Sequence, residues 1–427
     1  MISLPEKYYL VINDRFELFF RGVIKKHNPY QYYVKAYCEK GYTYNRYFTY
    51  TPIEGEEGEY PLSIIVYDDD GQIIEQKDTI LIVNKPEKPL KKLNVLCIGD
   101  SETVNGVWPY VGYQKFSEVF PNSLNFIGKM KKEEIGFEGY GGWQWKTFCG
   151  DETESRTSSV WVKCKHKLEP CNVHSIWINN DLEWILETIT PNKLKFKRGS
   201  NNTTLTNPKL AETFTLKFGN FKHDDIEVEE YEYSDANPFW NKLESKLDFK
   251  TYLEDNNLEK PDLVITFLTG NGLYIPYAKE FPIHEEYATK FLKALHEAFP
   301  DALIGTMGIE LPCCNGGVTA CYGASGYYHD WYGDTISIFH YDEWLMKFVK
   351  TPYFKNFTYY FDVKSQFDSE NSYPYELQKV NNRSDVMEKL GTNGLHPSLN
   401  GYKQIGDAFY RFLVQLVKDC LLYTSPS

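Results

Sequence analysis

Apolar and polar residues alternate in short runs over the first 88 residues of the chain. The runs are rich in Tyr, Phe, Ile and Val, and this alternation of β-branched and aromatic residues with polar ones is typical of strands. They cover residues 8–12, 17–20, 32–37 and 63–67. The turn signal Asp-Asp-Asp-Gly at 68–71 leads into a further strand. The pattern predicts a small all-β sandwich in residues 1–88.

From residue 93 the pattern changes to continuous apolar strands separated by amphipathic helices. The predicted strands are 94–98, 262–268 and 302–307, and the predicted helices are 286–299 and 402–417. Strands that are apolar throughout, with helices between them, indicate a parallel sheet covered on both faces. We therefore predict an α/β domain over residues 93–420, joined to the first module by a short linker at 89–92.

An insertion interrupts this rhythm between residues 150 and 235. It contains strand-like runs at 159–163 and 213–218 and a polar loop at 201–204. We interpret it as a partly β insertion that forms a rim or a lid of a cleft. The final residues, 421–427, break the pattern of the helix before them and resemble a non-native tail left by adapter read-through, so we expect them to lie outside the fold.

Composition narrows the classes of partner. The chain has 427 residues, of which 42% are hydrophobic, and this is enough for a large core. Its net charge of −13 argues against a nucleic-acid backbone and against anionic membranes as partners. No apolar run reaches about 18 residues, so no membrane insertion is expected. Aromatic residues make up 16%, which suits β-structure and also suits surfaces that stack on sugar rings.

Cysteine usage and the first residues bear on cofactors and location. The nine cysteines follow no metal spacing, and the irregular set Cys164, His166, Cys171 and His174 fits no zinc pattern. We therefore expect mostly free thiols, no metal and no cofactor. Residues 1–10 do not resemble a secretory signal. This favours a cytoplasmic or virion-associated protein, or an extracellular one if the recorded start is incomplete.

The first candidate chemistry follows the predicted strand 94–98. Gly99, Asp100 and Ser101 come directly after it, at the end of the strand where sites form in open α/β sheets. A serine near a helix N-terminus can act as a nucleophile while backbone N–H groups stabilise an oxyanion. Gly99 permits the tight turn, and we expect Asp100 to brace the loop by accepting backbone N–H bonds.

Three further blocks complete a pattern that none of them carries alone. Gly142 lies in a glycine-rich loop at 137–143, and Asn271 follows the predicted strand 262–268. His396 lies in the run Gly-Thr-Asn-Gly-Leu-His-Pro-Ser, just before the last helix. An ordinary turn would explain the first two blocks separately. In this order, however, the blocks predict a single site with a serine, a histidine and oxyanion donors.

With these blocks the chain resembles the SGNH (GDSL-type) hydrolase superfamily over residues 93–417. The resemblance implies a three-layer α/β/α, flavodoxin-like fold and ester hydrolysis through a serine nucleophile. It implies that Ser101 is the nucleophile and that His396 is the general base and then the general acid. The N–H groups of Ser101 and Gly142 and the amide of Asn271 would form the oxyanion hole.

The chain departs from the family pattern in two blocks. The family has Asp three residues before the histidine, where this chain has Asn393. A neutral amide can orient an imidazole but cannot stabilise an imidazolium by charge, so a Ser101–His396 dyad and an inactive site both stay open. In the third block, Thr269 and Gly272 replace the family's Gly and Asp, while the asparagine between them is kept.

The leading hypothesis is a bacterial or phage serine esterase that acts on O-acyl, foremost O-acetyl, esters of carbohydrate. Trp143, His329 and Trp331 are expected to line a sugar-binding cleft. Residues 1–88 resemble an immunoglobulin-like module whose role the sequence does not indicate. A thioesterase or lysophospholipase is an alternative. Another is a non-catalytic binding or structural protein of a phage tail or cell surface, with a decayed site. The oligomeric state stays open.

Overall fold

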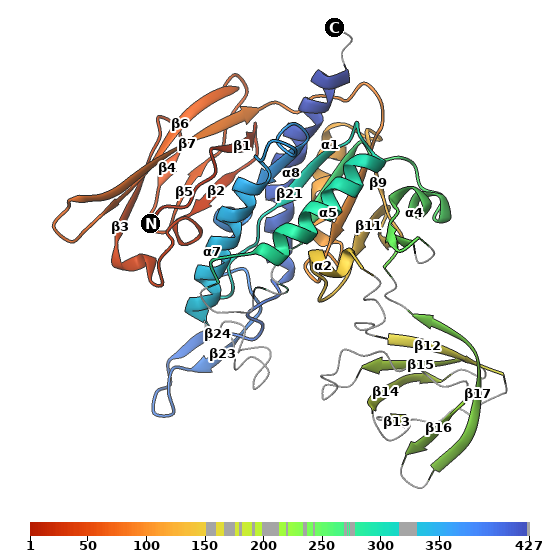
Figure 1. Cartoon of the computed structure of the whole chain (residues 1–427). Helices are drawn as coiled ribbons and strands as arrows, with labels where there is room; N and C mark the ends of the chain where they lie inside the picture. The colour runs from red at the N-terminus through yellow and green to blue at the C-terminus, as the bar shows by residue number, and fades with distance from the viewer. Residues whose placement is uncertain are drawn as a thin grey trace. The chain divides into compact units, whose positions relative to one another are not determined.

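The computed structural model describes most of the chain, with its gaps concentrated between residues 150 and 245. The described residues are 1–150, 159–165, 176–178, 182–189, 193–198, 213–218, 221–233, 237–241, 244–268, 271, 273, 278–315 and 331–424. The chain divides into two compact units, one formed by Met1–Trp145 with Leu253–Ser427 and the other by Lys146–Tyr252 (Figure 1). Over the described residues, none of the helices combines the length and the apolar character needed to cross a membrane.

Two sheets occupy the first 84 residues and share one apolar core. The elements are β1 (Lys7–Val11), β2 (Phe16–Phe19), η1 (Phe20–Gly22), η2 (Pro29–Gln31), β3 (Tyr33–Tyr37), β4 (Tyr42–Thr43), β5 (Tyr47–Tyr50), β6 (Gly58–Tyr67) and β7 (Ile73–Asn84). One sheet has the order β1-β7-β6-β3 and the other the order β2-β5-β4. Leu10 and Leu62 from the first sheet and Phe16 and Phe48 from the second lie in the common core. The segment is all-β, as predicted from the alternation of apolar and polar residues along its strands.

A mostly parallel sheet forms the centre of the first unit. Its strands are β8 (Leu93–Gly99), β9 (Leu124–Ile127), β10 (Met130–Lys132), β11 (Ile135–Gly139), β20 (Leu263–Phe267), β21 (Leu303–Met307) and β22 (Thr358–Phe361). Five parallel strands run in the order β9-β8-β20-β21-β22, and β11 also pairs in parallel with the end of β8. Every residue of β20 and β21 is buried, as expected for apolar strands covered on both faces.

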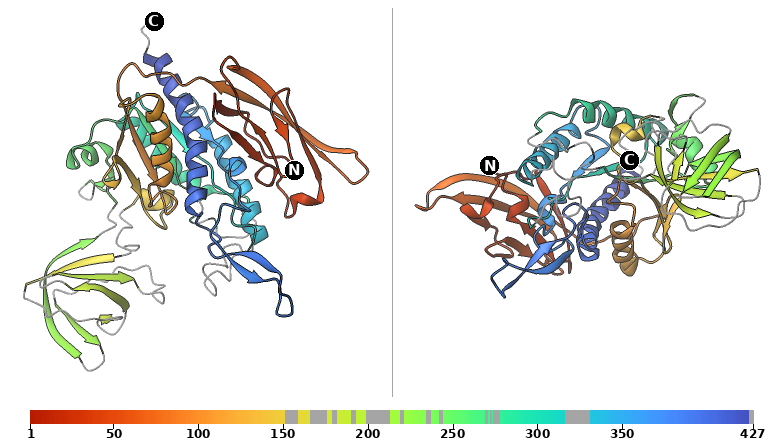
Figure 2. Two further views of the ribbon diagram at one scale, coloured as in Figure 1. Left: turned by 180° about the vertical axis from the view of Figure 1, so that it is seen from behind. Right: turned by 90° about the horizontal axis from the view of Figure 1, so that it is seen from below.

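Helices lie on both faces of this sheet. They are α1 (Val107–Val119), α5 (Pro282–Ala298), α7 (Trp331–Phe348) and α8 (Leu399–Thr424). The view from below places α1 and α8 on one side of the sheet and α5 and α7 on the other (Figure 2). The mixed α/β fold class predicted from the sequence is confirmed. One expectation was wrong, because residues 421–424 do not break from the last helix but continue it.

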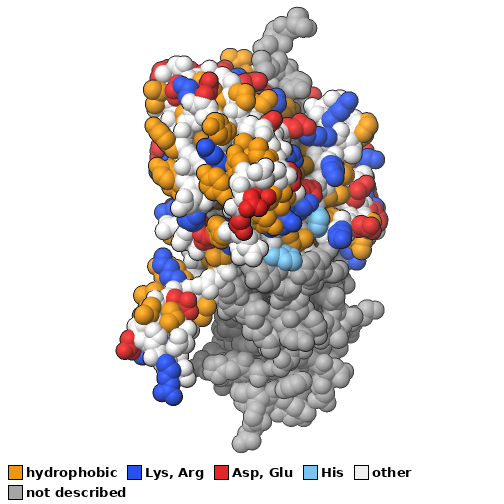
Figure 3. Space-filling view, turned by 90° about the vertical axis from the view of Figure 1, so that its left-hand side faces the viewer, with side chains coloured by type: hydrophobic (Ala, Val, Ile, Leu, Met, Phe, Trp, Pro, Cys, Tyr) orange, Lys and Arg blue, Asp and Glu red, His pale blue; other side chains and the backbone are white. Residues whose placement is uncertain are grey.

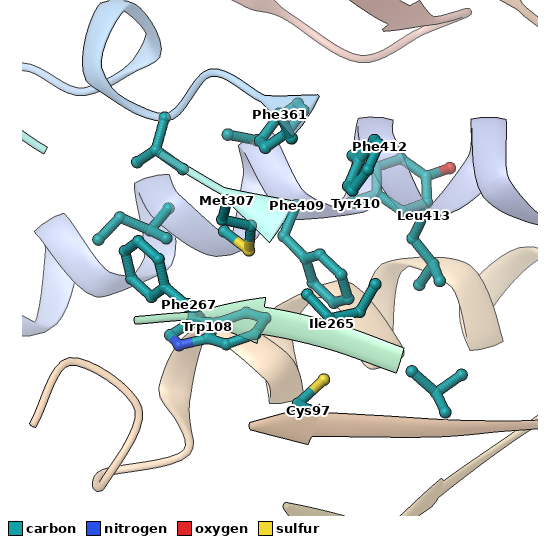
Figure 4. Close-up of a cluster of buried hydrophobic side chains, with 14 of the residues drawn as sticks. Cys97, Trp108, Ile265, Phe267, Met307, Phe361, Phe409, Tyr410, Phe412 and Leu413 are labelled. Carbon is teal, nitrogen blue, oxygen red and sulfur yellow. The ribbon is translucent and has the colours of Figure 1, made fainter. Parts of the chain in front are cut away.

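Aromatic side chains of α8 close the core against the sheet (Figure 4). Phe409 and Phe412 reach toward the strands that carry Ile265 and Met307. The indole of Trp108, from α1, meets the Phe409 ring edge-on, with 4.9 Å between the ring centroids. The chain after β22 adds a short turn, η4 (Lys364–Gln366), and a hairpin of β23 (Tyr375–Lys379) and β24 (Met387–Gly391).

The second unit contains a closed six-stranded barrel. The strands are β12 (Ser159–Cys164), β13 (Ile176–Ile178), β14 (Leu182–Ile189), β15 (Lys193–Arg198), β16 (Thr213–Phe218) and β17 (Phe221–Tyr233), in the order β12-β15-β14-β13-β16-β17. Along the chain, α2 (Trp145–Phe148) precedes the barrel strands. The short elements β18 (Trp240–Asn241), β19 (Lys246–Leu247) and α4 (Phe249–Asp255) follow them. Outside the barrel, the ring of Phe239 packs on Phe148 and Tyr252.

Candidate active site

The predicted blocks lie at the carboxyl edge of the central sheet. Because β11, β8, β20 and β21 are parallel neighbours, the segments that follow them emerge at the same edge. Ser101 follows β8, Gly142 follows β11 and Asn271 follows β20. The block of His396 is bonded to the loop that follows β21 at this edge, because the Cys313 N–H in that loop donates to the Gly394 carbonyl at 3.0 Å. The parallel topology therefore brings distant parts of the chain to one place.

Ser101 lies in a tight turn braced by its neighbours. The Asp100 side chain is fully buried, and its Oδ1 accepts the Glu102 N–H at 3.1 Å. The Thr103 N–H donates to the Asp100 carbonyl at 3.0 Å. A Cβ at Gly99 would overlap the Thr103 side chain, so the turn needs glycine at that position. The expected bracing role of Asp100 is confirmed, and Ser101 itself is half-buried between the strand and α1.

Asn271 connects the turn of Ser101 to the glycine-rich loop. Its Nδ2 donates to Asp100 Oδ2 and to the Trp143 carbonyl, each at 3.0 Å. Asp100 immediately precedes the serine, and Trp143 immediately follows Gly142. The amide thus stands between the two loops that carry the predicted oxyanion donors.

The glycine-rich loop approaches the serine with its backbone. Gly142 has φ +78°, a conformation that favours glycine, and a Cβ at Gly141 would lie 4.0 Å from Ser101 Cβ. The Trp143 ring is only 1% exposed and stacks on Tyr140, with 4.5 Å between the centroids. Trp143 therefore contributes its carbonyl to this site, and its ring belongs to the core under the loop.

Asn393 holds the backbone that carries His396. Its Oδ1 accepts the N–H groups of Leu395 at 3.1 Å and of His396 at 2.8 Å, so its oxygen is committed to the turn. Burial lowers the pKa of His396 below the ordinary 6.5. A depressed pKa keeps the imidazole neutral at pH 7, which is the form that can accept a proton.

Two buried carboxyl groups beside the histidine were not predicted. Glu102 Oε1 lies 3.7 Å from His396 Nε2, and the Glu102 side chain is 3% exposed. Glu310, which follows β21, is also buried beside it. Burial, the Glu310 carboxyl and Asp100 raise the pKa of Glu102, and burial raises the pKa of Glu310 to about 8. The one sequence signal for both residues was their position just after a buried strand.

The remaining predicted residues are only partly described. His329 lies outside the described residues, as do Thr269 and Gly272. Trp331 begins α7, but its side chain lies outside the described part of the structure. Within the described ranges, no group of three or more His, Cys, Asp or Glu residues is arranged to hold a metal ion.

Comparisons with known proteins give distant similarities only. No family model and no curated protein matches the chain. It is similar to a possible lipase from Chitinophaga pinensis, at 12% identity and a TM-score of 0.35, over 76% of this chain and 98% of that one. A carbohydrate esterase family 2 enzyme with a carbohydrate binding domain from Corynascus thermopiles (Myceliophthora fergusii) aligns at 10% identity and a TM-score of 0.32, over 98% and 97% of the two chains.

A family two carbohydrate esterase from Cellvibrio japonicus aligns at 10% identity and a TM-score of 0.29, over 95% of this chain and 87% of that one. At these values the similarities assign neither a family nor an activity to this chain. The function has to be argued from its own residues.

Proposed function

We propose that this protein is a serine esterase that hydrolyses O-acyl, foremost O-acetyl, esters of carbohydrate. The observation that carries the proposal is the pair of bonds from the Asn271 amide to Asp100 and to the Trp143 carbonyl. Through these bonds, the turn of Ser101, the loop of Gly142 and the asparagine assemble around one point. That arrangement suits a reaction in which a serine attacks a carbonyl carbon while nearby donors hold the oxygen.

The proposed reaction uses an acyl-enzyme. Ser101 Oγ attacks the ester carbonyl carbon as His396 takes the hydroxyl proton. The negative charge that develops on the carbonyl oxygen is held by the N–H groups of Ser101 and Gly142. Both N–H groups of the Asn271 amide bond to Asp100 and to the Trp143 carbonyl, so this amide joins the oxyanion hole only if one of these bonds is exchanged for the substrate oxygen. His396 then gives its proton to the departing alcohol, and a water molecule attacks the acyl-enzyme by the reverse sequence. The site needs no cofactor for any of these steps.

The strand order supports the finer fold assignment within this proposal. The order β9-β8-β20-β21-β22 corresponds to the second, first, third, fourth and fifth strands of a flavodoxin-like sheet, with the nucleophile after the first. We assign residues 93–420 to an SGNH-type hydrolase domain and residues 1–88 to an immunoglobulin-like module, with 89–92 as the linker.

Exposed tyrosines support carbohydrate as the alcohol part of the substrate. On β3, Tyr33 and Tyr37 are 63% and 57% exposed, and Lys35 lies between them on the same face. Hydrophobic side chains also appear between charged ones on the side of the molecule shown in Figure 3. Flat rings with polar groups among them suit sugars, because a ring stacks on the apolar face of a pyranose while neighbours bond its hydroxyls.

A second candidate is a binding protein with a decayed site, and one observation favours it. Asn393 occupies the place of the family's aspartate, and its oxygen is engaged by two backbone N–H groups. A fluorophosphonate probe distinguishes the two functions, because it reacts only with an activated serine. Labelling at Ser101 would exclude the decayed site. A thioesterase or lysophospholipase would instead be recognised by a preference for long acyl chains.

The experiment that tests the proposal measures the release of acetate from acetylated xylan and acetylated mannan, and of p-nitrophenol from p-nitrophenyl acetate. Ser101→Ala is compared with the unmodified protein and with Ser117→Ala, whose serine lies in α1 outside the site. Release that is lost only in Ser101→Ala is the expected result. Equal release by all three proteins, with circular dichroism showing intact folding, would refute the esterase.

A further inference from the structure

The imidazole of His396 lacks the charged neighbour that its position in the sequence would normally supply. Residue 393 is a neutral asparagine whose oxygen accepts two backbone N–H groups. A general base that becomes an imidazolium during the reaction is stabilised by a nearby carboxylate. A replacement for that carboxylate should therefore lie within a few ångströms of the ring and be shielded from water.

Glu102 meets both conditions. Its Oε1 is 3.7 Å from Nε2 of His396, which is beyond hydrogen-bond length but within the range of a direct charge interaction. Catalytic hydrogen bonds are often long in structures without substrate and shorten when it binds. Glu102 also belongs to the turn of Ser101, and its N–H bond to Asp100 fixes the backbone from which the side chain starts.

The surroundings of Glu102 explain how a carboxyl group can stay buried there. Glu310 lies beside it, and the Oε2 atoms of both side chains are buried without a hydrogen-bond partner among the described residues. Two carboxyl groups in one apolar site cannot both be charged, so the pair keeps a proton. Other titratable groups that face the pair are Asp100 from the same turn, Asp342 from α7, Tyr402 from α8 and Tyr373.

We propose that Glu102, sharing a proton with Glu310, is the acidic positioning residue of His396 and takes the place of the aspartate that residue 393 lacks. This inference rests on the proposed esterase function. In the active form the pair holds one proton, which the two carboxyl groups share, because burial raises the pKa of Glu102 well above its ordinary value and that of Glu310 to about 8. The single negative charge of the pair reaches His396 through Glu102, the nearer of the two carboxyl groups.

The proton balance of the step is simple. The Ser101 proton passes to Nδ1 of His396. The N–H on Nε2, which faces Glu102, points at the Glu102 carboxylate. The proton then leaves with the alcohol, so the pair neither gains nor loses a proton in the cycle. Since the pKa of Glu310 is about 8, the pair acquires its charge as the pH rises through this value.

The experiment combines activity with a spectroscopic measurement on the full chain. The variants are Glu102→Gln, Glu102→Asp and Glu310→Gln. Asp419→Asn serves as the control, because Asp419 is a half-buried carboxyl with a raised pKa, away from this cluster. Each protein is assayed with p-nitrophenyl acetate from pH 6 to 9, and the His396 ring proton resonance is followed by NMR over the same range.

We expect the unmodified protein to gain kcat between pH 7 and 9. Glu102→Gln should lose that gain and show a kcat about 100-fold lower at pH 9 with KM unchanged, at the lower end of what positioned acid–base groups contribute. Glu102→Asp should recover part of the rate. In NMR, the His396 resonance should show a second inflection near pH 8 that disappears in Glu102→Gln. It should move to lower pH in Glu310→Gln, where the repulsion between the two carboxyls is gone.

An unchanged second inflection in Glu102→Gln, or none in the unmodified protein, would overturn the inference. If Glu102→Gln does not fold, the shift of the inflection in Glu310→Gln decides in the same way. The NMR measurement does not need activity, so it separates this inference from the esterase proposal. Absence of Ser101-dependent hydrolysis would refute the esterase, whereas the titration alone decides whether Glu102 acts on His396.

Discussion

Asn393 is the residue at which this site differs most from the pattern it resembles. Its oxygen accepts the N–H groups of Leu395 and His396, and an aspartate could accept the same two bonds. We therefore expect Asn393→Asp to fold normally and to raise kcat/KM at pH 7 by up to about tenfold, the factor that about 1.4 kcal/mol of charge stabilisation provides. Steady-state kinetics with p-nitrophenyl acetate measures this effect.

Asn393→Ala is the informative comparison for that substitution. It removes the acceptor from two backbone N–H groups and should lower the free energy of unfolding by about 1 kcal/mol, as the loss of a cap does. A fall in activity in Asn393→Asp, with stability retained, would mean that the amide itself is required by its neighbours. That result would contradict the charge argument.

The acid side of the pH profile depends on His396. Burial disfavours its charged form and lowers its pKa below 6.5, so the ring stays neutral to a lower pH than an exposed imidazole. Because the neutral ring is the base, kcat/KM should fall on acidification, and its half-maximal value should lie below pH 6.5. The measurement is kcat/KM against pH, with circular dichroism at each pH as a control for unfolding. Activity that stays flat down to about pH 4 would exclude a histidine base.

At the residue scale, the sequence allowed candidate site residues to be selected where they belong to a motif suited to the chemistry. Ser101, Gly142 and Asn271 could be selected because each follows a predicted strand and has a side chain or backbone suited to one task. Glu102 and Glu310 could not be selected, because nothing local marks a glutamate as buried. Glu102 meets Glu310, from the segment after β21, and Tyr402 of α8, and such contacts between distant segments are set only by the tertiary structure.

At the scale of elements, the close crossing of α1 and α8 is the most demanding contact. A Cβ at Gly112 of α1 would overlap the Phe409 ring, and a Cβ at Gly406 of α8 would overlap Val111. We expect Gly112→Ala to destabilise the protein by about 1–3 kcal/mol, as overpacking does, although alanine favours a helix by about 1 kcal/mol. Urea denaturation measures the change.

Lys403→Ala is the control for the helix contact, because residue 403 is exposed on α8 and alanine fits there. It should change the free energy of unfolding by less than about 0.5 kcal/mol. If Gly112→Ala proved as stable as this control, α1 and α8 would not be in the close contact described.

Strands that are apolar throughout were predictable, and a short, half-buried strand was not. The predicted strands 262–268 and 302–307 agree with β20 and β21, since both are apolar throughout. The edge strand β22 was missed because its sequence, Thr-Tyr-Tyr-Phe, is short and only half-buried. The last helix was predicted too short, as 402–417, whereas α8 extends from Leu399 to Thr424.

At the scale of the whole molecule, buried polar contacts join the N-terminal sheets to the α/β sheet. The Tyr8 hydroxyl donates to Asp362 Oδ2 at 2.9 Å, and the Lys364 ammonium donates to the Gly22 carbonyl at 3.0 Å. A sequence pattern cannot predict such contacts, because they connect residues more than 300 positions apart. They imply that the two parts do not unfold independently.

Arg411 of α8 provides the sharpest test of that coupling. Its Nη1 donates to Asp14 Oδ2 at 2.6 Å and to the Arg15 carbonyl at 3.0 Å, and the side chain is 3% exposed. Arg411→Met leaves the Asp14 carboxylate buried with Lys115 as its remaining cation. Removing one partner of a buried ion pair costs about 3–5 kcal/mol, and we expect a loss of that size in a single unfolding transition.

Lys85→Met is the matched control, because the Lys85–Glu54 pair lies in the same N-terminal part but is exposed on both sides. An exposed pair contributes about 0–1 kcal/mol, so this variant should unfold almost like the unmodified protein. Urea denaturation followed by tryptophan fluorescence and by far-ultraviolet circular dichroism compares the two variants. Two separate transitions in the unmodified protein, or equal stability of both variants, would mean that the N-terminal sheets fold on their own. A coincident loss in Arg411→Met would instead make them part of the scaffold that holds α8 and, with it, the histidine at its start.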